Sequence, residues 1–197
     1  MTLRPDQPGA ADDARIAVQA AGGDARAFSI LMRRHKDAIY RFCRRYVGDA
    51  DDAYDLTQQT FVSAWSALGR YDPNRAFTIW LRAIALNKCR DHGRRATVRR
   101  LIFGARPKTA EALAEVASDV PSVETQAHDI RMLRVLDRAL ATLPDGLKTP
   151  LILTALDGLN TAEAAVVMGL SPKAVEMRLY RARKALSAQL ETAVEKG

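Results

Sequence analysis

The stretch of residues 160–186, NTAEAAVVMGLSPKAVEMRLYRARKAL, decides the fold of this chain. It predicts a helix, a tight turn and a second helix. Asn160 can cap the first helix, because Glu163 stands three residues later, where a capping box requires it. The apolar run that follows stops at Gly169, the residue type that ends a helix and permits a sharp turn. Ser171 can then cap a second helix.

The second helix, which has Pro172 at its first position, is expected to present two different faces. Its inward stripe consists of apolar residues four, three and four positions apart: Val175, Leu179, Ala182 and Leu186. The opposite face carries long, polar and mostly cationic side chains: Lys173, Glu176, Met177, Tyr180, Arg181 and Lys184. Such a face suits a helix lying in the DNA major groove, although an ordinary solvated charged face has the same pattern.

Composition sets the broad class of protein. The 197 residues are enough for one large or two small domains, and the formal net charge of +7 favours nucleic acid as a polyanionic partner. Few residues are aromatic and many are Ala, Leu and Arg, which predicts an all-α fold. The sequence contains no apolar run long enough to span a membrane and no signal peptide at its start. We therefore expect a cytoplasmic protein without membrane insertion.

Two groups of residues raise the question of a metal site. Cys89 and His92 stand three apart, and Cys43 lies elsewhere, so zinc is conceivable. Paired C-x-x-C spacing is absent, however, and isolated cysteines on apolar stripes are usually small core residues. An acidic run also surrounds Asp52, but aspartate is common where a helix begins. We expect no metal and no cofactor, and the sequence leaves a redox role of the cysteines open.

Breaks in periodicity divide the chain into four expected parts. These are a flexible N-terminal arm (1–23), a helical module (24–100), a flexible linker (101–128) and a helix-turn-helix module (129–192). Helices are expected from Asp24 to Tyr46, Asp51 to Leu68, Phe77 to Arg95, Asp129 to Leu143 and Lys148 to Leu156.

Two stretches of the first module suggest binding surfaces. The helix from Asp51 is expected to turn its stripe of Leu56, Phe61, Ala64, Trp65 and Leu68 inward, leaving an Asp/Gln face suited to another protein's helix. The densest basic tract follows Trp80, and Tyr71, Phe77 and Trp80 stand directly before it. Aromatic rings beside cations can hold unstacked bases, but spacing alone does not distinguish this role from core packing.

Three motifs resemble the extracytoplasmic-function sigma factors, the minimal class of bacterial sigma factor. Residues 52–65, DAYDLTQQTFVSAW, are similar to a D-A-x-D-L-x-Q-x-x-F-x-x-x-W helix of that family. Residues 71–95, YDPNRAFTIWLRAIALNKCRDHGRR, resemble its segment with a D-P turn, a W-L pair and I-A-x-N. Residues 143–186 resemble its L-P to R-x-x-R-A-R-x-x-L segment. Departures at Gln59, Ala164 and Glu176 leave the class intact and affect the expected promoter sequence.

The resemblance implies a role for each motif. Binding to the clamp helices of the β′ subunit of core RNA polymerase is implied for Asp52, Asp55, Leu56, Gln58, Gln59 and Phe61. The β subunit of the polymerase is also an expected partner of the chain. Melting and reading of the minus-ten promoter element is implied for Tyr71, Phe77, Trp80, Asn87, Lys88, Arg94 and Arg95. Reading of the minus-thirty-five element is implied for Ser171, Pro172, Lys173, Glu176, Met177, Tyr180, Arg181, Arg183 and Lys184. Family members are usually controlled by an anti-sigma factor, so such a partner is expected.

Two other classes of function remain open at this point. A helix-turn-helix regulator acting without core polymerase would use the C-terminal module alone, but it would not explain the motifs of residues 52–65 and 71–95. A nucleic-acid enzyme would need a Walker loop, a metal-ligand spacing or a nucleophile motif, and none is visible. We therefore expect a protein that is not an enzyme.

Overall fold

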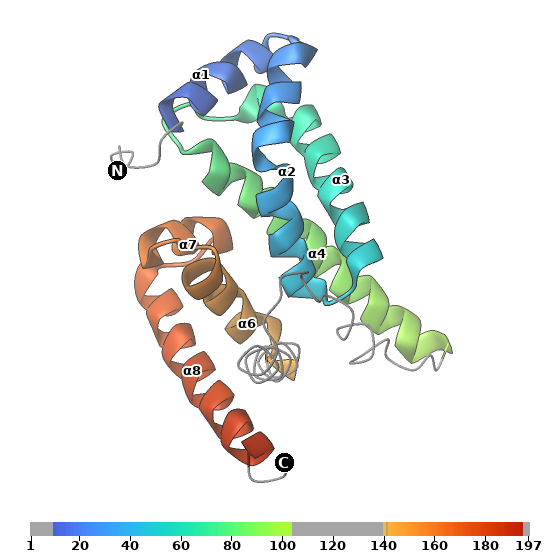
Figure 1. Ribbon diagram of the computed structural model, residues 1–197, viewed down its shortest axis with the longest axis vertical. Helices are drawn as coiled ribbons and strands as arrows, with labels where there is room; N and C mark the ends of the chain where they lie inside the picture. Colours follow the sequence, from blue (N-terminus) through green and yellow to red (C-terminus); the bar gives the residue numbers. More distant parts are fainter. Residues whose placement is uncertain (1–9, 104–139, 141, 195–197) are drawn as a thin grey trace, which may run out of the picture.

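The computed structural model describes residues 10–103, 140 and 142–194, and the regular elements within these residues are all helical. The elements are α1 (Ala10–Ala21), α2 (Ala25–Val47), α3 (Ala50–Ala67), η1 (Leu68–Arg70), α4 (Phe77–Phe103), α6 (Asp145–Leu151), η3 (Ile152–Leu156), α7 (Thr161–Met168) and α8 (Pro172–Val194). They form two helical groups (Figure 1), which confirms the expected all-α fold. The expected linker (101–128) lies outside the described residues from residue 104 on. The helix expected from Asp129 lies outside them up to residue 139.

The N-terminal module is built on α2, which packs against α1, α3 and α4. The carboxylate of Asp24 caps α2 by accepting hydrogen bonds from the backbone N–H groups of Arg26 and Ala27. The helix ends at Gly48, whose φ of 81° favours glycine. Phe42 is fully buried, and burying a side chain of this size contributes roughly 1.5–3 kcal/mol. Capping and packing therefore agree with the boundaries that the sequence predicted for α2.

The prediction of a flexible arm over residues 1–23 is wrong for residues 10–21, which form α1. Ile16, Ala17 and Ala20 are buried, and the small alanines let α1 approach α2 closely. Asp13 is also buried: its carboxylate accepts hydrogen bonds from Arg34 Nη1 at 2.8 Å and lies 2.7 Å from His35 Nε2. Burial lowers the pKa of His35, and Asp13 opposes that shift. Helix α1 is thus part of the N-terminal module.

The C-terminal module contains the helix-turn-helix that the sequence predicts. Asn160 and Glu163 form a complete capping box at the start of α7, with both hydrogen bonds at 2.9 Å. Gly169, with φ of 66°, ends α7, and Ser171 Oγ accepts from the Ala174 N–H at the start of α8. The short helix expected from Lys148 instead begins at Asp145, and its last part, η3, is a π-helical turn.

Replacing Asn160 with alanine should lower the free energy of unfolding by about 1 kcal/mol, because the substitution removes one side of the capping box. Chemical denaturation of the full chain measures this change. Ser187→Ala, on an exposed part of α8, is the control and should change stability much less. Equal stability of Asn160→Ala and the unsubstituted chain would contradict a stabilising role of this cap.

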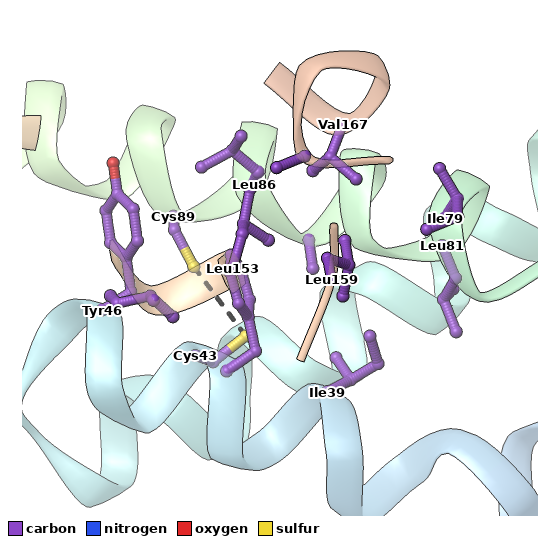
Figure 2. Packing of buried hydrophobic residues seen from close by; sticks show 14 of the residues in the cluster. Ile39, Cys43, Tyr46, Ile79, Leu81, Leu86, Cys89, Leu153, Leu159 and Val167 are labelled. Carbon is purple, nitrogen blue, oxygen red and sulfur yellow. Dashed lines mark hydrogen bonds between the residues drawn. The ribbon is translucent and has the colours of Figure 1, made fainter. Parts of the chain in front are cut away.

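The two modules are in contact. Helix α7 packs against α4, and η3 packs against α2. Figure 2 shows Leu86 of α4 near Val167 of α7, with Leu153 and Leu159 close by; all four side chains are buried. Phe77, Leu81, Ala85 and Cys89 form the buried stripe by which α4 packs on its own module, and Leu86 lies off this stripe. The contact between modules therefore explains its burial.

Candidate protein and nucleic-acid interfaces

The outward face of α3 carries the polar residues that the sequence assigned to polymerase binding. Asp55, Gln58 and Gln59 are exposed, and Asp52 is partly exposed. Leu56 and Phe61, in contrast, are 3% and 5% exposed and belong to the core. Both side chains hold α3 in the module, and the polar residues form its free surface; a polymerase contact by Leu56 and Phe61 stays a prediction.

A groove between α3 and α4 runs beside this face. One hollow of about 430 Å³ has a lining of Asp55, Gln58, Gln59, Val62, Ser63 and Lys88. A neighbouring hollow is lined by Asp52 and Asp55 of α3 and, on α4, by the acid Asp91 and the cations Lys88, Arg95 and Arg99. His92 Nε2 lies 3.3 Å from Asp52 Oδ2 across this second hollow. The α3 wall of the groove is thus acidic, and the α4 wall is mainly cationic.

The structure adds two apolar residues to this surface that the sequence interpretation missed. Val62 is 67% exposed and Tyr54 is 51% exposed, and both lie on α3. The sequence could have indicated them, because Tyr54, Gln58 and Val62 stand four residues apart and therefore share one face of the helix. Exposed apolar side chains beside a polar groove are typical of a protein-binding surface.

The aromatic cluster before the basic tract is mostly core. The ring centroids of Tyr71, Phe77 and Trp80 lie 5.2–5.6 Å from one another. Tyr71 and Phe77 are 8% and 1% exposed, and the Tyr71 hydroxyl donates to the Arg75 carbonyl at 2.6 Å. Burial raises the pKa of Tyr71 to about 12. These two rings cannot stack on bases from the core, so their assignment to DNA contact is corrected; Trp80 is half-buried and keeps an accessible side.

The remaining residues assigned to the minus-ten element form two pairs on α4, and the members of each pair are seven residues apart on one face of the helix. Asn87, Arg94 and Arg95 are exposed on α4. Lys88 and Arg95 line the α3–α4 groove with the candidate polymerase-binding residues. Arg94 pairs with Asp91 on the same helix. The structure therefore brings Lys88 and Arg95 together with α3.

The recognition face of α8 is open to solvent along its length. Val175, Leu179 and Ala182 are buried, as the stripe predicts. The residues assigned to the minus-thirty-five element are exposed: Ser171, Pro172, Lys173, Glu176, Met177, Tyr180, Arg181, Arg183 and Lys184. Ser171 also caps the helix through its hydroxyl. In the part of the chain that the structure describes, Glu176 forms no ion pair.

The two cysteines lie against each other inside the N-terminal module. Cys43 and Cys89 are fully buried, and their Sγ atoms are 3.8 Å apart (Figure 2). The hydrogen bond with Cys43, together with burial, raises the pKa of the Cys89 thiol. Among the described residues, no group of three or more His, Cys, Asp or Glu side chains could hold a metal ion. Within the same residues, no helix is both long and apolar enough to cross a membrane.

Comparison with known proteins identifies both modules. Residues 31–99 match the family described as sigma-70 region 2, and residues 133–186 match the family described as sigma-70, region 4. The RNA polymerase sigma factor CnrH of Cupriavidus metallidurans is 43% identical over 186 residues, covering 93% of this chain and 97% of the relative. The ECF RNA polymerase sigma factor SigW of Bacillus subtilis is 28% identical, covering 87% of this chain and 93% of the relative.

Solved structures agree with these matches. The structure of CnrH in complex with the cytosolic domain of CnrY has a TM-score of 0.67 at 36% identity, covering 91% of this chain and 97% of that chain. The sigma factor RpoE of Bartonella quintana, in complex with the anti-sigma factor NepR, has the same TM-score at 21% identity and shares the fold; the match covers 83% of this chain and 96% of that one. The chain belongs to the sigma-70 family, in its extracytoplasmic-function class of RNA polymerase sigma factors.

Proposed function

We propose that this sigma factor binds core RNA polymerase through the outward face of α3 and the adjoining α3–α4 groove. The observation that carries the proposal is the exposed set of Asp55, Gln58 and Gln59, which borders the groove together with Val62. A polar face that includes an exposed apolar residue fits a helix of a partner protein, and the resemblance implies the clamp helices of the β′ subunit.

The N-terminal module is proposed to open and read the minus-ten element. Asn87 is exposed on α4. The Trp80 ring packs against the buried rings of Tyr71 and Phe77 and remains partly exposed to solvent. A ring held in this way can stack on an unpaired base without losing much side-chain freedom. The C-terminal module is proposed to read the minus-thirty-five duplex through the exposed face of α8.

We also propose that an anti-sigma factor controls this chain. The chain itself is proposed to act in the cytoplasm, without enzymatic activity or a cofactor of its own. The relative RpoE was solved with an anti-sigma factor, and CnrH with the cytosolic domain of CnrY. Catalysis of RNA synthesis would then come from the polymerase, with the sigma factor supplying promoter recognition.

A pull-down of purified core polymerase with the full chain tests this assignment directly. Binding without any added DNA is expected. If the chain instead failed to bring down core polymerase and bound promoter DNA equally well with and without it, the chain would be a helix-turn-helix regulator. A nuclease assay with and without magnesium tests for an enzymatic activity.

Glu176→Ala should relax sequence preference at one base pair of the minus-thirty-five element. A carboxylate repels phosphate, so an exposed Glu176 in the groove would accept a hydrogen bond from a base amino group. The expected loss on the preferred site is about 1–3 kcal/mol. Selection of binding sites from a random pool measures the preference of both proteins.

The control for this prediction is Lys184→Ala, which should weaken binding to all sequences similarly and flatten its salt dependence. Identical preferred sequences for the unsubstituted chain and Glu176→Ala would mean that Glu176 only stabilises the helix surface, by a few tenths of a kcal/mol.

A further inference from the structure

Two arginines of the N-terminal module hold one carboxylate of the C-terminal module. Arg45 Nη1, on α2, lies 3.1 Å from Asp157 Oδ1, and Arg82 Nε, on α4, lies 3.0 Å from Asp157 Oδ2. Arg45 also donates to the Leu156 carbonyl at 3.1 Å. The side chain of Asp157 is 5% exposed and that of Arg82 is 13% exposed. Two guanidinium groups from different helices thus converge on one oxyanion.

A second polar contact joins the modules nearby. Lys148 of α6 is buried, and its Nζ donates to the Tyr46 carbonyl of α2 at 2.9 Å. The same ammonium lies 4.6 Å from the centre of the Tyr46 ring. This contact does not involve Arg45 or Arg82, so it can be removed without changing either arginine.

The docked arrangement is too compact to reach both promoter elements. The positions minus ten and minus thirty-five differ by about 25 base pairs, or roughly 85 Å at ~3.4 Å per base pair. A compact chain of this length has a radius of gyration of about 16 Å, which corresponds to a sphere only roughly 40 Å across. If the proposed function is correct, the modules must therefore separate on the promoter.

Separation changes the surroundings of the two arginines. Once Asp157 leaves, two positive charges that converge on one point face each other without their counter-ion, which is unfavourable unless another anion or water replaces the carboxylate. Guanidinium groups bind phosphate with the same planar geometry by which they bind carboxylate. Arg82 lies on α4, the helix that also carries the exposed Asn87 proposed to face promoter DNA.

We propose that Arg45 and Arg82 form a phosphate-binding site for promoter DNA, and that Asp157 occupies this site while the modules are docked. Docking and DNA then compete for the same two side chains. The inference rests on the proposed function, because it assigns the incoming anion to the promoter backbone. It adds Arg45 of α2, which lies outside the sequence motifs, and gives a specific partner to Arg82, which belongs to the basic tract after Trp80 but is not among the residues assigned to the minus-ten element.

Three full-length variants separate this site from a simple contact between modules. Asp157→Asn removes the competing anion, Lys148→Met removes the second contact, and Arg45→Gln combined with Arg82→Gln removes the phosphate-binding groups. All three should open the free chain, which small-angle X-ray scattering detects as an increased radius of gyration. Circular dichroism checks that each variant remains helical, and the single arginine variants replace the double variant if it does not fold.

Promoter binding by each holoenzyme then distinguishes the variants. The probe is a genomic promoter fragment that the unsubstituted holoenzyme transcribes, and its affinity is measured across a salt series. The double arginine variant should bind about tenfold more weakly, and the slope of log K against log salt should fall by about 2, because roughly two phosphate contacts are lost. Asp157→Asn and Lys148→Met should keep the affinity and slope of the unsubstituted holoenzyme.

Two results would overturn the proposal. The first is that the double arginine variant binds the promoter with the same affinity and the same salt slope as Asp157→Asn. The arginines would then only join the modules or contact an acidic protein partner. An unchanged radius of gyration for Asp157→Asn would show that this carboxylate does not hold the docked state. Failure of the proposed function is seen separately, as absence of any transcript from the unsubstituted holoenzyme.

Discussion

Replacing Asp55 and Gln58 together with alanine is expected to weaken binding of core polymerase by about 30-fold, equivalent to a hot-spot loss of roughly 2 kcal/mol. Both side chains are exposed on α3 and border the groove lined by Val62 and Lys88. The helix itself should be unaffected, because its attachment depends on the buried Leu56 and Phe61. Titration of fluorescently labelled chain with core polymerase measures the change.

A matched control is available on the other helices of the same module. Asp37→Ala combined with Gln19→Ala removes the same two side-chain types from exposed positions on α2 and α1. This control should retain the affinity of the unsubstituted chain. If the α3 variant bound polymerase as tightly as the control, the α3 face would not be the polymerase-binding surface.

Combining Trp80→Ala with Asn87→Ala is expected to abolish promoter opening while leaving duplex binding through α8 in place. Trp80 offers the accessible ring of a cluster whose other members are buried, and loss of base stacking costs about 1–3 kcal/mol per base. Loss of Asn87 removes an exposed hydrogen-bonding side chain from the same helix. Permanganate reactivity of promoter thymines near the start site reports opening directly.

The burial of Trp80 makes a second variant necessary for this test. Trp80→Phe keeps an aromatic ring in the cluster and should retain much of the opening, whereas Trp80→Ala should not. Thymines that remain reactive with the combined alanine variant would contradict the assignment of the minus-ten surface to these two residues.

The features that sequence predicts well in this chain are local. The capping box at Asn160, the turn at Gly169 and the stripe through Val175 each depend on residues within about one or two turns of one another. The polar face of α3 was also predictable, because residues such as Asp55 lie opposite the buried stripe. In these cases local propensity and tertiary packing favour the same structure.

The features that sequence missed arise from contacts between distant segments. Helix α1 was interpreted as an arm because alanine is a weak indicator of burial, although Ala17 and Ala20 pack closely in the structure. The core position of Tyr71 could not be distinguished from base stacking by spacing alone. Asp157 is 112 residues from Arg45 in the sequence, and no local pattern could place them together.

Run-off transcription with purified core polymerase on genomic fragments tests the central claim most directly. Core polymerase alone should give no defined transcripts, and addition of this chain should produce transcripts from discrete start sites. Those transcripts should disappear with the Asp55→Ala, Gln58→Ala variant and with the Trp80→Ala, Asn87→Ala variant. Absence of discrete transcripts with the unsubstituted chain, under conditions where it binds core polymerase, would contradict its assignment as a promoter-recognising sigma factor.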